Sequence, residues 1–230
     1  LYSIFFNKDF ILNSPGFKAY FFPINYLNYY KNKLVPIKQI SAYDSLQRIC
    51  SICETLKVNL YAAHGTLLGV IRSESFAGRP KDLDFYISST DMDIILDNLE
   101  FFKKNNIKPY RCKIFKGVIH FKSSRGVPIA LEVFKFDESK NKYFRNYLYF
   151  VDKKSILNKF KIPQYIQKFD MQKIKNSTNN IIDITLKLEK IEKKIFNHII
   201  KVPSNYLELL INQYGEEWGI PKGKQNGYKL

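Results

Sequence analysis

The hydrophobic pattern in the first half of the chain changes from helical spacing to strand spacing. Apolar residues recur at steps of three and four over residues 37–56, which predicts an amphipathic helix, and a short apolar run at residues 58–63 predicts a strand. The next stretch, HGTLLGVIR, has an early glycine and then Leu67, Leu68 and Ile71 at helical spacing, which indicates a turn into a short helix. A strand, a glycine turn and a helix in this order can cradle a phosphate group.

A second pattern brings two acidic residues together. In the segment DLDFYIS, Asp82 and Asp84 alternate with Leu83 and Phe85. Because successive side chains of a strand point to opposite faces, a strand here puts both carboxylates on one face and the apolar residues on the other. The sequence therefore predicts a strand that carries an acidic pair on one face and is apolar on the other.

The rest of the chain predicts first a sheet and then helices. Asp91 and Asp93 begin a predicted helix that ends near Lys104, and we interpret both acids as capping residues that complement the helix dipole. Three strands of a mixed or antiparallel sheet are predicted at residues 107–115, 118–121 and 129–136. Beyond residue 150 the chain is Lys-rich, and candidate helices lie at residues 153–160, 181–199 and 204–214, the last ended by Gly215.

Composition excludes two classes of protein. With 45% hydrophobic and 25% charged residues among 230, the chain has globular rather than disordered usage. Its apolar stretches are interrupted well short of the ~20 residues that cross a membrane, so we expect a protein that is soluble or peripheral to a membrane. Three cysteines are too few for a disulfide framework. Cys50 and Cys53 lie on an apolar helical face, which favours core packing over metal binding.

The formal net charge is +16, from 37 Lys and Arg against 21 Asp and Glu. A charge of this size attracts polyanions such as nucleic acid, anionic lipid and phosphate-rich glycans. It is equally typical of a chain that is rich in Lys, Asn and Ile for compositional reasons, as proteins from AT-rich genomes tend to be. The charge alone therefore leaves both explanations open.

The candidate chemistry lies around the acidic pair. Asp82 and Asp84 can supply the oxygen ligands that Mg²⁺ prefers beside a substrate phosphate. Glu132 is the candidate for a third ligand, which would allow two ions ~3.5–4 Å apart. An acid in the apolar run PIALEVF is costly to bury without a partner. The alternatives are a surface strand with two acids, and a Glu132 that is solvated or paired with a lysine.

The glycine turn upstream adds candidate contacts to a phosphate. Gly65 and Thr66 can offer backbone N–H groups and a hydroxyl to one phosphate, and Arg72 can bind a second. The three histidines have no Cys or Glu spacing typical of a nucleophile or a zinc site, so we interpret them as structural, with His64 at most in contact with substrate: they are His64, His120 and His198.

The run HGTLLGVIRSESFAGRPKDLDFYI, residues 64–87, resembles the LicD and fukutin family of phosphotransferases. Residues 65–72 match the family's G-T-L-L-G-x-x-R block, Phe76 matches the aromatic of the following loop, and Asp82 and Asp84 match its D-x-D pair. The segment VPSNYLELLINQYGEEWGIP, residues 202–221, resembles the family's closing helix and its Y-G-x-x-W segment. Lys81 before the acid pair is similar to the fukutin-like branch, whereas many bacterial members have further acids there.

The resemblance implies an α+β fold of the nucleotidyltransferase type, with a mixed β-sheet flanked by helices and a helical C-terminal part. It divides the chain into an aromatic-rich N-terminal lobe or extension at residues 1–36, a nucleotidyltransferase-like catalytic core at 37–150, and a helical C-terminal part of the same domain at 151–230. It also implies transfer of a substituted phosphate, such as phosphocholine, ribitol phosphate or glycerol phosphate. The donor is CDP-linked, and the acceptor is a hydroxyl of a glycan or cell-surface polysaccharide.

The residues that this function requires can be named. The predicted catalytic and metal-binding residues are Asp82, Asp84 and Glu132, with two Mg²⁺ or Mn²⁺ ions as cofactor. The predicted substrate-binding residues are Gly65, Thr66, Arg72, His64 and Lys81. A bacterial protein of this kind is expected in the cytoplasm, at the inner face of the membrane, and nucleic acid is not its expected partner. Two alternatives stay open: a nucleotidyltransferase acting on RNA or a small molecule, and a non-catalytic polyanion-binding module.

Overall fold

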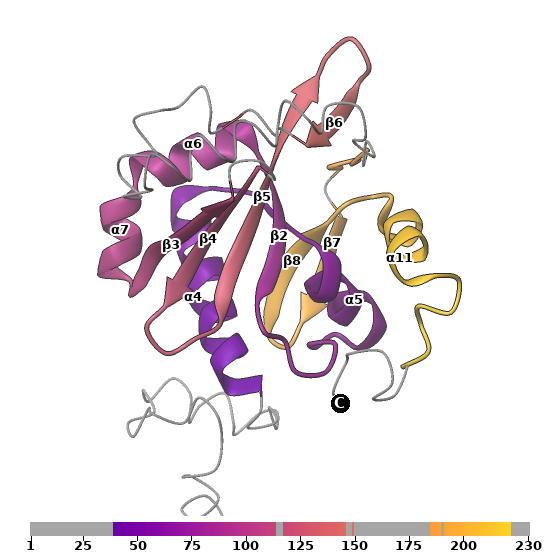
Figure 1. The fold of residues 1–230 in the computed structure, drawn as a ribbon, viewed down its shortest axis with the longest axis horizontal. Helices are drawn as coiled ribbons and strands as arrows, with labels where there is room; N and C mark the ends of the chain where they lie inside the picture. The colour runs from indigo at the N-terminus through magenta and orange to yellow at the C-terminus, as the bar shows by residue number, and fades with distance from the viewer. Residues whose placement is uncertain (1–38, 114–116, 146–148, 150–184, 190, 222–230) are drawn as a thin grey trace, which may run out of the picture.

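One mixed sheet organises the described part of the chain (Figure 1). The computed structural model describes residues 39–113, 117–145, 149, 185–189 and 191–221. Within them the sheet has eight strands: seven follow the order β3-β4-β5-β2-β1-β8-β7, and β6 pairs with β5 outside this path. The strands are β1 Leu60–Ala62, β2 Leu83–Ser88, β3 Ile107–Lys113, β4 Val118–Ser123, β5 Pro128–Asp137, β6 Lys142–Arg145, β7 Ile191–Ile195 and β8 His198–Val202. The helices are α4 Ile40–Leu56, α5 His64–Ser73, α6 Ser89–Asp97, α7 Leu99–Lys104 and α11 Tyr206–Tyr214.

The sheet combines parallel and antiparallel pairs. Strand β2 lies parallel to β5 and antiparallel to β1, and β1 in turn lies parallel to β8. The three strands predicted in the middle of the chain are present as β3, β4 and β5, with antiparallel pairing between neighbours. The prediction of an α+β protein with a mixed sheet flanked by helices is therefore confirmed.

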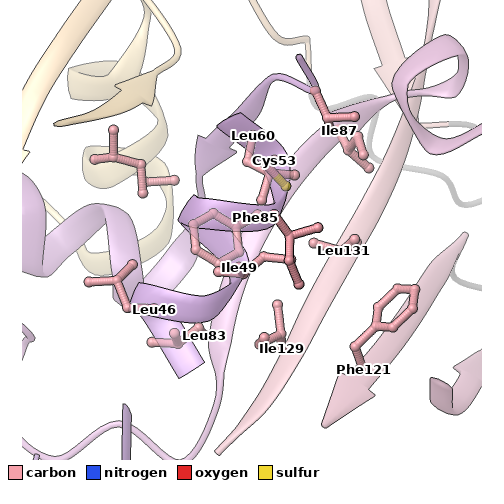
Figure 2. Packing of buried hydrophobic residues seen from close by; sticks show 14 of the residues in the cluster. Leu46, Ile49, Cys53, Leu60, Leu83, Phe85, Ile87, Phe121, Ile129 and Leu131 are labelled. Carbon is pink, nitrogen blue, oxygen red and sulfur yellow. The ribbon is translucent and has the colours of Figure 1, made fainter. Parts of the chain in front are cut away.

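Helix α4 buries the apolar side of its helical repeat against one face of the sheet, and in Figure 1 it lies behind the strands. Leu46, Ile49 and Cys53 of α4 pack around Phe85 of β2 (Figure 2). Each fully buried aliphatic side chain of this kind contributes roughly 1.5–3 kcal/mol relative to an exposed one. Cys50 and Cys53 are free thiols at this interface, which confirms that they serve core packing.

The predicted helix from Asp91 to Lys104 is two helices, α6 and α7, separated at Asn98. The residue that caps α6 is Ser88, whose hydroxyl accepts from the Asp91 N–H at 3.0 Å and donates to the Asp91 carboxylate at 2.9 Å. Asp91 is the third residue of α6 and its carboxylate accepts from the hydroxyl of the capping serine, so Asp91 supports the cap and does not form it. Asp93 instead accepts a hydrogen bond from the Tyr149 hydroxyl. The prediction is therefore confirmed for Asp91 as an acid in the first turn, where it complements the helix dipole, and is wrong for Asp93.

The predicted helix at residues 181–199 is also wrong where the structure describes it. Strands β7 and β8 form an antiparallel hairpin there, and Tyr61 of β1 pairs with Lys201 of β8. Isoleucines four residues apart favoured a helix, but β-branched residues fit strands better, and β8 gains a hydrogen-bonded neighbour on each side. Pairing buries Ile200 and Val202 and leaves Ile199 62% exposed. The expected helical C-terminal part is thus interrupted by a strand pair.

The last predicted helix, at residues 204–214, is present as α11. Gly215 ends it with φ +84° and ψ 174°, a backbone conformation that is essentially restricted to glycine. The predicted lobe at residues 1–36 and the predicted helix at 153–160 lie outside the described residues. Among the helices that the structure describes, none is both long and apolar enough to cross a membrane.

Candidate active site

The register between β2 and β5 places the predicted acids on one face of the sheet. Asp84 pairs with Ala130, and Tyr86 pairs with Glu132, so Asp84 and Glu132 are diagonal neighbours on this face. Asp82 lies one residue before β2 and is exposed. Leu83 and Phe85 point to the opposite face, into the core. The predicted alternation of β2 is confirmed, and it separates the acids from the main core.

The electrostatics of Asp84 indicate that the acids are close to one another. The pKa of Asp84 is raised to about 7, first because the carboxyl is partly buried and then because the charge of Asp82 repels its ionised form. The charge of His64 opposes this shift, and that of Glu132 adds to it. A cation between Asp82 and Asp84 would remove this repulsion. The pair therefore has the donor chemistry of a divalent-cation site.

The glycine turn is fixed directly to the acidic strand. Thr66, which is only 3% exposed, uses its hydroxyl oxygen to accept a hydrogen bond from the Asp84 N–H at 2.9 Å. The Asp84 carbonyl accepts from the Ala63 N–H at 3.0 Å, just before α5 begins. These two bonds hold the start of α5 beside Asp84. The role that the structure gives Thr66 is to position this junction, and its predicted contact with a phosphate stays a prediction.

Gly65 lies in the first turn of α5, where backbone N–H groups have no partner within the helix. A methyl group added at Gly65 would meet nothing within 4 Å, so the fold itself does not require glycine there. Gly69 differs, because a methyl group there would overlap the Ser75 carbonyl oxygen and lie 2.6 Å from the Ala77 nitrogen. Gly69 therefore serves the packing of the loop after α5, whereas Gly65 leaves open space at the start of the helix.

Both oxygens of Glu132 have cationic partners. One accepts from Nε2 of His64 at 2.8 Å, the other from Nη2 of Arg145 at 2.7 Å, and the residue is 9% exposed. Burial lowers the pKa of His64, but its hydrogen bond to Glu132 and the charge of that carboxylate outweigh burial and raise the pKa to about 9. The imidazole is therefore protonated at neutral pH, and Nδ1 donates to Gln213 of α11 at 2.9 Å.

This arrangement bears on the predicted third metal ligand. The alternative of a paired Glu132 is realised, with a histidine and an arginine in place of a lysine. Each oxygen of Glu132 already has a cationic partner, and the ligand role of Glu132 stays a prediction. Among the described residues, no three or more His, Cys, Asp or Glu side chains are grouped as a metal site. The two aspartates are thus the residues that best fit a cation.

Two further predicted residues flank the site. Arg72 follows Gly65 by two turns of α5, which puts both on the same side of the helix, about 10 Å apart. Lys81 is exposed in the loop just before Asp82. In the part of the chain that the structure describes, neither side chain forms an ion pair, and their predicted contacts with substrate stay predictions. Phe76, the matched aromatic, is a core residue with its ring 4.9 Å from that of Phe196.

Sequence reasoning missed Arg145 and Gln213. Arg145 lies on β6 behind a short turn, in the segment KYFR, which is too short for a confident strand prediction from alternation. Gln213 is 149 positions from its partner His64, and no local pattern signals that contact. The role of His64 itself, as the residue that joins α5, β5 and α11, was also underestimated.

His120 of β4 extends the polar face to the next strand. It pairs with Ala130, which in turn pairs with Asp84. The imidazole is 8% exposed, and its Nδ1 has no hydrogen-bond partner among the described residues. Burial first, and then the positive charges of Lys113 and Arg111, lower the pKa of His120 to about 4, although the charge of Glu132 opposes them. His120 is therefore neutral at physiological pH.

Replacing His120 by glutamine is expected to make the fold less sensitive to acid. The folded pKa lies below the ~6.5 of a free histidine, so the unfolded chain binds more protons as the pH falls. The stability that the neutral His120 contributes to the fold is therefore complete above pH ~6.5 and is lost as the pH falls toward 4. Between pH 7 and pH 4.5 the free energy of unfolding in urea should fall by about 1–2 kcal/mol less in the variant than in wild type. Equal losses in the two proteins would contradict this assignment.

Known proteins add no identification to this geometry. No family model and no curated protein sequence matches the chain. The function must therefore be argued from the site itself and from the resemblance of its motifs.

Proposed function

We propose that this chain is a metal-dependent phosphotransferase of the nucleotidyltransferase fold, which transfers a substituted phosphate from a CDP-linked donor to a glycan hydroxyl. The observation that carries the proposal is the joint between the acidic strand and the glycine turn. Thr66 and Ala63 each bond to the backbone of Asp84, so the proposed cation ligand and the open start of a helix lie side by side. The resemblance of residues 64–87 to the LicD and fukutin family supports the same reaction and suggests a cell-surface polysaccharide as acceptor.

The described residues suit the two requirements of phosphoryl transfer, positioning and charge stabilisation. Asp82 and Asp84 would hold a divalent cation, which would neutralise the negative charge of the donor's diphosphate. The first N–H groups of α5 have no partner within the helix, and Gly65 leaves open space in this first turn, so a phosphate oxygen could accept from them. Glu132 keeps His64 protonated, which adds a positive charge at the same helix end. Arg72 lies on the same side of α5, where it can bind a second phosphate.

The direct test is release of CMP. The full chain is incubated with CDP-choline, CDP-ribitol or CDP-glycerol, a polysaccharide acceptor, and Mn²⁺ or Mg²⁺. We expect CMP to form with one of these donors only when acceptor and metal are both present, and to stop when EDTA is added. Absence of CMP with every donor, together with pyrophosphate release from a nucleoside triphosphate, would instead indicate a nucleotidyltransferase. Absence of both products would favour the polyanion-binding alternative.

Replacing Gly65 by alanine is expected to reduce turnover without harming the fold. The added methyl group meets no protein atom, and alanine in a helix is favoured over glycine, so the unfolding free energy should stay equal or rise by about 0.5–1 kcal/mol. Turnover should fall by about tenfold or more, because the methyl group occupies the space in front of the helix N–H groups. CMP release and urea unfolding are measured on the same preparation.

Gly219→Ala is the matched control for this variant. A methyl group at Gly219 also meets nothing within 4 Å, and Gly219 lies beyond α11, near the C-terminal end of the described chain. This control should change neither stability nor turnover appreciably. Normal turnover in Gly65→Ala would mean that no ligand approaches the start of α5.

A further inference from the structure

The polar face of the sheet continues from the acidic residues into a basic region. Across the strands, Asp84 pairs with Ala130, Ala130 with His120, and His120 with Arg111 of β3. In the next row, Lys113 of β3 pairs with Val118 of β4. Because paired residues of neighbouring strands share a face, Arg111, His120 and Lys113 lie on the same side of the sheet as Asp84. We call these three residues the β3–β4 basic group.

The basic group interacts electrostatically with the acidic site and within itself. The charge of Lys113 lowers the pKa of Asp84, and together with Arg111 it lowers the pKa of His120. Such influence requires proximity, because charges at a distance are screened by water and salt. Within the described residues, neither Arg111 nor Lys113 forms an ion pair. Two positive charges therefore lie beside a histidine, and neither is within ion-pair distance of a carboxylate of the described residues.

The buried imidazole points to a ligand independently of the two charges. His120 is 8% exposed, and its Nδ1 has no partner among the described residues. A buried polar atom without a partner costs free energy, and native proteins tolerate few of them. An anion bound at this position would pair with both charges, and it could accept a hydrogen bond from the imidazole.

We propose that the β3–β4 basic group is a subsite for a phosphate group of the substrate. Strands lie ≈ 4.8 Å apart, so His120 is about 10 Å from Asp84 across the sheet. One phosphate-bearing substrate can span that distance with a group at each place. The phosphate belongs either to the CDP-linked donor or to a phosphorylated acceptor, an assignment that rests on the proposed function. The subsite itself recognises the phosphate whichever molecule carries it.

The test measures binding without metal and without turnover. The full chain in EDTA is titrated with pyrophosphate, CDP and glycerol 3-phosphate by calorimetry, at low salt. Arg111→Gln and His120→Gln are compared with Lys104→Gln, which removes the same charge as Arg111→Gln but at the end of α7, near the opposite end of β3. Far-ultraviolet circular dichroism verifies folding, and the exposed Arg111 gives a variant that should fold even if the one at His120 does not.

We expect Arg111→Gln and His120→Gln to weaken binding by about tenfold, whereas Lys104→Gln stays within about twofold of wild type. Weakening for CDP and pyrophosphate alone assigns the subsite to the donor, and weakening for glycerol 3-phosphate alone assigns it to the acceptor. Binding that is absent in wild type, unchanged in Arg111→Gln, or weakened equally by Lys104→Gln would overturn the proposal. Failure of CMP release would overturn the proposed function and leave this binding result standing.

Discussion

Asp84→Asn is expected to abolish metal-dependent CMP release while raising the stability of the protein above neutral pH. The carboxylate is partly buried beside Asp82 and Glu132, and its pKa is raised to about 7. An acid with a raised folded pKa destabilises the fold as the pH rises from ~4 to 7, and the cost is complete above 7. Asparagine keeps the shape and removes the charge. We therefore expect a gain of about 1–3 kcal/mol at pH 8, which vanishes near pH 4.

The expected loss of activity is much larger than this gain. A metal contributes several kcal/mol to charge stabilisation, so removal of a ligand should reduce turnover by about 10³-fold. Asp82→Asn should show a similar loss with a smaller gain in stability, because Asp82 is exposed. Added Mn²⁺ should raise the melting temperature of wild type and leave that of either variant unchanged.

Asp97→Asn is the matched control for the acidic pair, since Asp97 is an exposed acid at the end of α6. It should leave turnover and the response to Mn²⁺ as in wild type. Undiminished CMP release in Asp84→Asn would show that Asp84 is not part of the catalytic machinery. A variant that loses stability in proportion to activity would identify Asp84 as a structural residue instead.

Gly69→Ala is expected to destabilise the protein by about 3–5 kcal/mol. The methyl group would overlap the Ser75 carbonyl oxygen and lie 2.6 Å from the Ala77 nitrogen. Both atoms belong to the backbone, so no side-chain rotation relieves the clash, and the loop itself must move. That movement would pull Phe76 away from Phe196, whose ring lies 4.9 Å from it. Urea unfolding measures the loss of stability.

Gly65→Ala serves as the internal control for this prediction, because the same substitution four residues earlier on α5 meets no atom within 4 Å. The two variants should thus differ in kind: Gly69→Ala loses stability, and Gly65→Ala loses turnover alone. A Gly69→Ala protein as stable as wild type would mean that the loop adapts easily. Packing would then not explain why residue 69 is a glycine.

Local sequence patterns predicted much of the fold. They failed where pairing with a strand distant in the sequence determines the secondary structure. The spacing of Leu46 and Ile49 predicted α4, and the alternation of Leu83 with Asp84 predicted β2 with its acids opposite the core. The hairpin of β7 and β8 was not predictable, since Ile191 and Ile195 have helical spacing and β8 pairs with β1, which is distant in the sequence. Long-range pairing of this kind leaves no local trace in the sequence.

The candidate site divides in the same way. Asp82 and Asp84 were predicted as site residues from the alternation of acidic and apolar positions. Glu132 was predicted because it is an acid within an otherwise apolar strand. What the sequence did not reveal is how Glu132 is neutralised, because its partners His64 and Arg145 come from separate elements, α5 and β6. Which cation reaches a buried acid depends on the packing of the whole sheet, and no spacing rule encodes that.

The position of β1 has a consequence for how the chain reaches its final state. This strand is short and lies between β2 and β8, so its second neighbour is supplied by residues 198–202. A chain that ended at residue 150 would leave β1 as an edge strand of the sheet. It would also lack Gln213, which accepts a hydrogen bond from His64. The sheet around β1 and the contacts of His64 are therefore complete only once residues 198–213 have been synthesised.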